Sequence, residues 1–188
     1  YKLKKLELCS SDALFFKPAS IKGFSGLKRV VQEVTGIALH EIHFLEVLKD
    51  IRVYRELFVD ILKVLRPKAL FLICYYYKMG MGLLSACSKL GISSVDIQHG
   101  KQGKYNVYLS HWTKIPPEGY EDLPDNFWVW GAESMKNINS WHPEGNPHHK
   151  AVIGGNRHLA SKVDEGPIKG TDKEEEFYAG LKSYEKVI

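Results

Sequence analysis

The sequence predicts an α/β fold, a Rossmann-like parallel sheet with helices on both faces, from three observations. Residues 69–75 form an unbroken apolar run, which is typical of a strand covered on both faces. Residues 79–90 carry apolar side chains at helical spacing and end before a glycine. Residues 92–97 then form a second short strand, and this alternation favours a parallel sheet.

The same patterns locate the other elements. The strongest helical pattern is a wide apolar stripe over residues 39–65, which Pro67 ends. Besides the strand–helix–strand segment 69–97, we expect helices over residues 25–36, 39–65 and 132–141, and strands over residues 126–130 and 150–153.

The composition is that of a globular protein. Hydrophobic residues make up 44% of the 188 residues, which is enough for a packed core. The net charge of +4 allows an anionic ligand or a membrane surface, but the dense basic stripe typical of nucleic-acid binding is missing. The three cysteines are an odd number, and two have apolar neighbours, so we interpret them as reduced residues of a cytosolic protein.

We expect two domains, of which the second is truncated. Residues 1–149 form a Rossmann-like domain that is incomplete at its N-terminus, and residues 150–188 form a hinge and the start of a second domain. The chain begins with Tyr1 and stops where an apolar run begins, so we expect a fragment of a longer protein.

The sharpest candidate site is Gln98-His99-Gly100, at the end of the second predicted strand. In open α/β sheets, ligands bind outside the carboxyl ends of the strands. An imidazole at that place can act as a general base or donate a hydrogen bond to a bound oxygen. Gly100 would let the backbone turn and a ligand approach closely. The alternative is a histidine that only closes a turn through a backbone carbonyl.

The segment 101–125 has neither helical nor strand periodicity. A connection of this length in a compact domain is usually functional or disordered. It carries Tyr105 and His111 among other aromatic residues and histidines, which argues against a bare linker.

Two glycine segments are weaker candidates. Gly80 and Gly82 lie where a strand turns into a helix, but the third glycine of a dinucleotide fingerprint is missing, so close packing is the favoured interpretation. The turn formed by Gly154, Gly155 and Asn156 follows a short strand. Its backbone N–H groups either face a phosphate or form a turn into a linker.

Other kinds of site find little support. His142, His148 and His149 do not match a structural zinc pattern and have no cysteine near them, so we expect no metal. We find no carboxylate pair at a fixed spacing, no Gly-x-Ser-x-Gly motif and no cysteine in the sequence context of a nucleophile.

Three segments, 95–100 (VDIQHG), 124–131 (PDNFWVWG) and 151–156 (AVIGGN), together resemble a known family. Their order is similar to that in GT-B-type glycosyltransferases of surface and capsular polysaccharide biosynthesis, and in the related glycerophosphate and polysialic acid transferases. In that family a strand ending in His-Gly belongs to the N-terminal, acceptor-side domain, and a later strand and turn open the donor-binding domain. The resemblance covers about residues 68–159, but the family's Gly-Asn-Pro is replaced here by Gly-Gly-Asn-Arg.

The resemblance implies the N-terminal part of a GT-B fold and the transfer of a sugar from a nucleotide-sugar donor to a growing glycan or a lipid-linked acceptor. We expect no cofactor and no nucleic-acid partner. The expected place is the cytoplasm, with peripheral association at the inner face of the membrane. As a hypothesis from their placement near the carboxyl ends of the strands, His99 acts as base on the acceptor hydroxyl or positions it. Gln98, Gly100, Tyr105 and His111 would bind the acceptor, and Gly154, Gly155 and Asn156 would bind the donor phosphates.

Two alternatives stay open. One is a sugar-nucleotide epimerase of the same two-domain architecture, and the other is a non-catalytic α/β binding domain. Because the donor pocket of the resembled family lies mostly in its C-terminal domain, we expect this fragment to be inactive alone.

Overall fold

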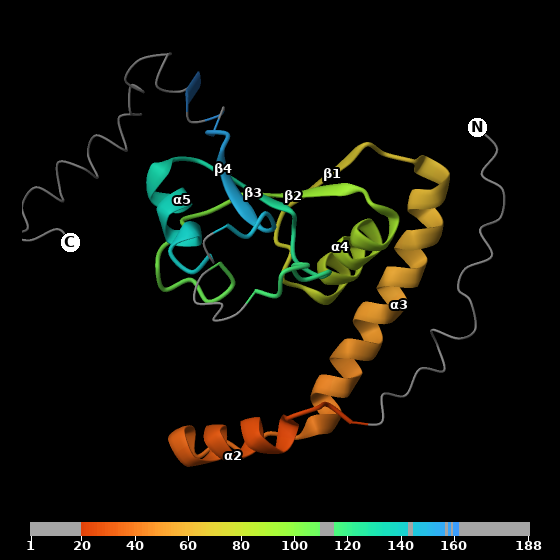
Figure 1. The fold of residues 1–188 in the computed structure, drawn as a ribbon, viewed down its shortest axis with the longest axis vertical. Coiled ribbons are helices and arrows are strands. Elements are labelled where there is room, and N and C mark those ends of the chain that lie inside the picture. The colour runs from red at the N-terminus through yellow and green to blue at the C-terminus, as the bar shows by residue number, and fades with distance from the viewer. Residues whose placement is uncertain (1–19, 110–114, 143–144, 157, 159, 162–188) are drawn as a thin grey trace, which may run out of the picture. The chain divides into compact units, whose positions relative to one another are not determined.

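The computed structural model describes residues 20–109, 115–142, 145–156, 158, 160 and 161. The chain divides into two compact units, Tyr1–Gly154 and Gly155–Ile188. The first unit holds the sheet and its helices (Figure 1). In the second unit, the Ala160 N–H donates to the Asn156 carbonyl at 2.9 Å, as in one turn of helix.

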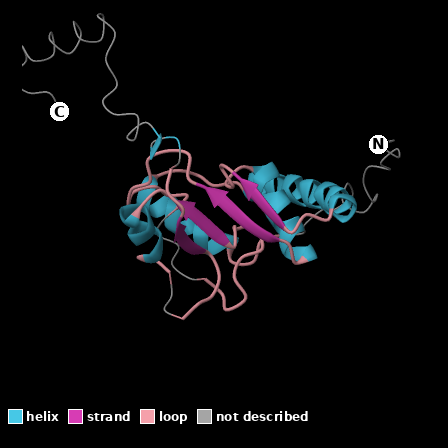
Figure 2. Ribbon diagram, turned by 90° about the horizontal axis from the view of Figure 1, so that it is seen from above, coloured by secondary structure: helices cyan, strands magenta, loops and turns pink. Residues whose placement is uncertain are grey.

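Four parallel strands form one sheet, whose arrows lie side by side in Figure 2. They lie across the sheet in their order along the chain. This all-parallel sheet with its helices confirms the predicted α/β, Rossmann-like fold class. The strands are β1 (Ala69–Leu72), β2 (Ser93–Ile97), β3 (Asn126–Val129) and β4 (Lys150–Ile153).

The four helices predicted from the apolar spacing are all present. The long α3 ends at Leu65, and the next residue, Arg66, has a left-handed backbone (φ 48°) just before Pro67. None of the described helices combines the length and the apolar composition that crossing a bilayer requires. The helices are α2 (Phe24–Thr35), α3 (Glu41–Leu65), α4 (Lys78–Leu90) and α5 (Ala132–Asn139).

The core lies on one face of the sheet. In one cluster, Leu84 of α4 and Ile138 of α5 pack with Phe127 and Val129 of β3. In a second cluster, residues of α3 and α4 pack with Leu70 of β1. These strand residues point to the same side of the sheet, because the parallel register aligns the rows of β1, β2 and β3. All three sheet-packed helices therefore cover the same face.

The other face of the sheet is uncovered within the described residues. Phe71 is 56% exposed, Trp128 is 37% exposed and Val152 is 48% exposed, and the register places these three residues on that second face. Right-handed crossovers explain this arrangement, since strands that follow one another in a single direction have all their connections on one side. The expectation of helices on both faces, and of a doubly covered β1, is thus not met by the described helices.

The boundary between the two units also differs from the expected one. The sequence placed β4 at the opening of a second domain that starts at residue 150. Instead, β4 pairs with β3 over its whole length, and the second unit begins at Gly155. This boundary depends on the pairing of β4 with β3, which are distant in the sequence. The apolar run at residues 150–153 does not by itself indicate which strand it pairs with.

Close packing explains the two glycines at the start of α4, as the sequence favoured. A Cβ at Gly82 would lie 2.5 Å from Cβ of Tyr54 on α3. A Cβ at Gly80 would lie 2.7 Å from the carbonyl oxygen of Tyr75 in the preceding turn. Neither site accepts a side chain without movement of the backbone that faces it.

Candidate active site

The carboxyl ends of β1 and β2 bring together side chains that are far apart in the sequence. Cys74 follows β1 by two residues, and His99 follows β2 by two residues. Because the two strands are parallel neighbours, these residues meet at one edge of the sheet. The described strands run across the sheet in a single direction, so this edge has no reversal of strand order of the kind at which ligands of doubly wound sheets bind.

Gln98 holds the turn that carries His99. Its side chain is 4% exposed, its Oε1 accepts the Trp130 N–H at 2.7 Å, and its Nε2 donates to the Gly100 carbonyl at 2.8 Å. The Trp130 indole N–H donates to the Gln98 carbonyl at 2.8 Å. Both amide atoms of Gln98 are engaged inside the fold, so its contribution to the site is the geometry of the turn.

His99 has an exposed side chain at this edge. Its Nε2 lies 3.1 Å from Sγ of Cys74, and its Nδ1 lies 3.8 Å from the same sulfur. The Tyr76 hydroxyl donates to that sulfur from 3.5 Å. An imidazole, a thiol and a phenol hydroxyl therefore meet in a partly exposed cluster, and such a cluster can transfer protons.

Tyr75 and Tyr76 connect this cluster to the loop that follows β2. The Tyr76 ring stacks on the Tyr108 ring, with centroids 4.2 Å apart and 15° between the planes. The buried Tyr75 donates its hydroxyl to the Tyr108 carbonyl, and burial raises its pKa. The start of the long loop is in this way attached to the turn between β1 and α4.

Asp96 is a buried carboxyl on β2, three residues before His99 in the chain. It is 3% exposed, and its Oδ1 accepts the Tyr75 N–H at 3.2 Å. Burial raises the pKa of Asp96 to about 7, although the hydrogen bond from Tyr75 acts in the opposite direction. This carboxyl thus changes its charge near neutral pH.

The other residues expected at the acceptor side are less closely tied to His99. Gly100 has no left-handed backbone, and a Cβ there would meet nothing within 4 Å, so the turn does not demand a glycine. Tyr105 is 79% exposed, with Lys104 Nζ 4.9 Å from its ring centroid. His111 lies outside the described residues.

The Gly154–Asn156 turn is divided between the two units. A Cβ on Gly154 would overlap the Trp128 ring, with only 1.8 Å to Cε2, so packing against this indole requires a glycine. Gly155 has φ 72°, a left-handed conformation that favours glycine. Gly155 and Asn156 belong to the second unit, and their role towards donor phosphates stays a prediction.

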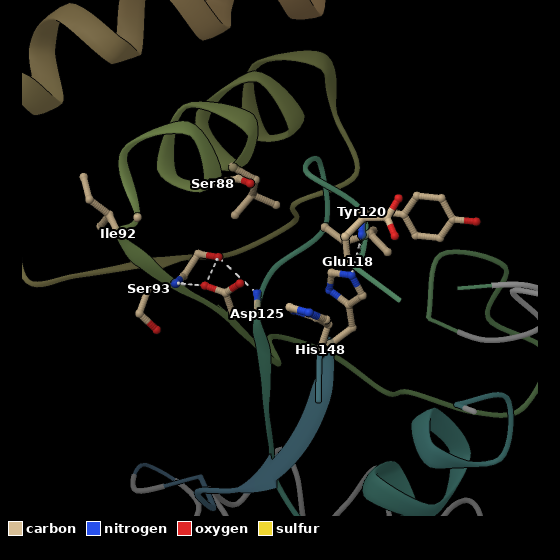
Figure 3. A pocket seen from close by; sticks show the side chains of 12 residues that line it. Ser88, Ile92, Ser93, Glu118, Tyr120, Asp125 and His148 are labelled. Atoms are coloured by element: carbon tan, nitrogen blue, oxygen red, sulfur yellow. Dashed lines mark hydrogen bonds between the residues drawn. The ribbon is translucent and has the colours of Figure 1, made fainter. Parts of the chain in front are cut away.

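A pocket of about 320 Å³ lies at the opposite edge, near the amino ends of the strands (Figure 3). Ser93, Asp125 and His148 are among its lining residues. The Asp125 carboxylate accepts hydrogen bonds from the Ser94 N–H at 2.8 Å and from its hydroxyl at 3.2 Å, and so joins the starts of β2 and β3. The buried His149 is likewise engaged: its Nδ1 lies 2.8 Å from the Pro124 carbonyl, and its Nε2 accepts the Tyr120 N–H at 2.8 Å.

These bonds give the polar groups of the pocket a structural role. His149 must be neutral to accept a hydrogen bond at Nε2, and burial lowers its pKa accordingly. Among the described residues, no three histidines, cysteines or carboxylates lie together as metal ligands. The pocket is therefore a weaker candidate for catalysis than the carboxyl edge.

Cys74 is the residue at this edge that sequence reasoning missed. The sequence offered no nucleophile motif around it, and its apolar neighbours indicated a core thiol. Its backbone has φ 60°, unusual for a residue other than glycine, and this conformation depends on the turn between β1 and α4. The contact with His99 spans 25 residues of chain, so no local pattern could have indicated it.

Comparison of the chain with protein-family models, curated proteins and solved structures finds no match. The fold and the site define the class directly. The chain is an α/β protein with a Rossmann-like parallel sheet and a thiol–imidazole–phenol cluster at the carboxyl edge.

Proposed function

We propose that the chain is the acceptor-side part of a glycosyltransferase, which transfers a sugar from a nucleotide-sugar donor to a cell-surface glycan. The observation that carries this proposal is the exposed imidazole of His99 at the carboxyl edge of a parallel sheet. The order of the three sequence segments that resemble GT-B-type enzymes supplies the reaction class. In this proposal His99 accepts the proton of the acceptor hydroxyl while that oxygen attacks the sugar carbon.

The turn around His99 supports this role. Gln98 is anchored by hydrogen bonds to Trp130 and Gly100, so the imidazole is presented from a rigid position. A general base needs such a fixed position, because proton transfer requires hydrogen-bond distance to the reacting hydroxyl. Nucleotide-sugar binding is assigned to a donor domain that follows this unit, and the 188-residue chain alone is therefore expected to be inactive.

The proposal requires a donor-binding domain in the same protein, and its test is sugar transfer by a protein that carries both parts. Replacing His99 with Gln should lower turnover by about 100-fold or more, because the reacting hydroxyl loses its base. His43→Gln is the matched control, since His43 is an exposed histidine on α3 whose side chain is 72% accessible. Near-normal turnover in His99→Gln would remove His99 from this role.

Product analysis separates the remaining possibilities. Transfer of labelled sugar to an acceptor supports the proposal, whereas conversion of the nucleotide sugar without an acceptor indicates an epimerase. A non-catalytic binding domain predicts neither reaction, and no thermal shift with nucleotide sugars or glycans. Transfer by the 188-residue chain alone would contradict the assignment of donor binding to another domain.

A further inference from the structure

The contact between Cys74 and His99 has a chemistry of its own. The His99 Nε2 is 3.1 Å from the Cys74 sulfur, a distance at which the imidazole can accept the thiol proton. A thiol is a weak nucleophile and a thiolate a strong one, and a neighbouring histidine is a common activator of cysteine. The pair therefore has the two groups that activation of a thiol requires.

A third group stabilises negative charge on the sulfur. The Tyr76 hydroxyl donates a hydrogen bond to Sγ, and this bond is the first cause of a rise in the Tyr76 pKa to about 12. A phenol keeps its proton at neutral pH, so the Tyr76 hydroxyl is available as a donor. A thiolate at Cys74 would thus lie between a protonated imidazole and a hydroxyl donor.

The position of Cys74 also distinguishes it from an ordinary core cysteine. Cys74 is half-buried, and the His99 side chain in contact with it is exposed, so the pair lies at the surface of the unit. Cys87, by contrast, is fully buried in α4 between α3 and β1, and burial raises its pKa to about 11. The left-handed backbone at Cys74 (φ 60°) costs energy in a residue other than glycine, a kind of strain that is concentrated at functional sites.

We propose that Cys74 and His99 form a reactive thiol–imidazole pair, a site of covalent modification by small disulfides. In the reaction, the Cys74 proton passes to His99 Nε2, and the sulfur attacks one sulfur of the reagent disulfide. A new S–S bond forms as the reagent's S–S bond breaks, and the second reagent sulfur leaves with the electron pair and takes a proton. Cys74 is oxidised to a mixed disulfide, and the reagent disulfide is the oxidant that is reduced.

This inference is independent of the proposed glycosyl transfer, because it concerns only the reactivity of the thiol. If both hold, an adduct on Cys74 would lie against the proposed base, and modification would block transfer. The labelling experiment needs no sugar donor, so its failure and the failure of the proposed function are distinguishable.

The experiment measures how fast 4,4′-dithiodipyridine labels Cys74 in the 188-residue chain at pH 7. The released thiopyridone gives the rate, and peptide mass spectrometry assigns it to Cys74. The same chain unfolded in guanidinium is the internal reference. Since a free thiol is only a few per cent ionised at pH 7, activation should make Cys74 about tenfold faster in the folded chain than in the unfolded one.

The variants identify the cause of the reactivity. His99→Gln should bring the rate at Cys74 down to about the unfolded reference, while the exposed His43→Gln should leave it unchanged. Tyr76→Phe should lower the rate by a smaller factor, because it removes only a hydrogen-bond donor. Circular dichroism checks that each variant is folded.

Two results would overturn the proposal. One is a folded wild-type chain in which Cys74 reacts no faster than in the unfolded chain. The other is a folded His99→Gln variant with the wild-type rate. The wild-type comparison is decisive even where a variant does not fold, because it needs no substitution.

Discussion

At the scale of single residues, Asp96 shows how burial decides chemistry next to the candidate site. The carboxyl lies on the covered face of β2, and it has one described backbone hydrogen bond, from Tyr75. Removing a carboxylate from water disfavours its charged form, which is why its pKa is raised to about 7. The result is a proton that the native state holds at pH values where an exposed aspartate has lost it.

This raised pKa predicts how stability depends on pH. In the native state Asp96 keeps its proton up to about pH 7, whereas in the unfolded chain it has the ordinary aspartate pKa of 3.8. The native state therefore binds more protons between these values, and the free energy of unfolding falls as pH rises through this range, by up to about 1.4 kcal/mol per pH unit. Asp96→Asn keeps an oxygen acceptor for the Tyr75 N–H and should lack this dependence.

Denaturant unfolding of both chains between pH 4.5 and pH 8 provides the measurement. Asp96→Asn should become the more stable chain, relative to wild type, as the pH rises. Parallel stability curves for the two chains would show that Asp96 is ionised in the native state throughout this range.

At the scale of elements, the crossing of α3 and α4 depends on one glycine. Gly82 lies on α4 directly against α3, with the position of a Cβ only 2.8 Å from the Ile51 carbonyl oxygen and 2.5 Å from Cβ of Tyr54. The helices pack on each other and also hold Leu70 of β1 in their shared cluster. A side chain at Gly82 would separate two backbones that both support the sheet.

Gly82→Ala should therefore destabilise the protein by about 1–3 kcal/mol, the usual cost of overpacking. Gly26→Ala is the matched control, since Gly26 lies within α2 with nothing within 4 Å of a Cβ position. The control should be neutral or stabilising by up to about 1 kcal/mol, because alanine favours a helix over glycine. Thermal unfolding of both variants measures the difference, and equal midpoints would contradict the close α3–α4 contact.

At the scale of the whole first unit, the described residues cover one face of the sheet and leave the other face open. The open face carries apolar side chains from neighbouring strands, and exposed apolar patches of this kind bind apolar molecules. Its apolar members on the strands are Phe71, Val95, Ile97, Trp128 and Val152.

The open face predicts that the 188-residue chain binds the dye ANS in its native state. Replacing Phe71 and Val152 with Thr should lower the bound fluorescence clearly, with a change in stability of about 1 kcal/mol or less, because each residue is about half exposed. Val107→Thr, at a 70% exposed valine in the loop, is the control and should leave the fluorescence unchanged. Wild-type dye binding in the double variant would mean that the dye binds at a surface other than the open face.

Local sequence patterns predict some features of the candidate site and not others. The spacing of apolar residues predicted α3, α4 and the strands, and the end of β2 at residues 98–100 was expected to carry the site. The chemistry of Gln98 was not predictable, since its buried amide acts through a hydrogen bond to Trp130, 32 residues away. The same limit applies to the thiol of Cys74.

The kinds of elements and their order follow from the sequence alone, because apolar periodicity is a property of a few neighbouring residues. The order of strands across the sheet was decided only by the tertiary structure, and with it the placement of α3, α4 and α5 on one face. The meeting of Cys74 with His99 has the same origin. It arises because β1 and β2 are parallel neighbours whose carboxyl ends coincide, and strand pairing depends on contacts between segments that are distant in the chain.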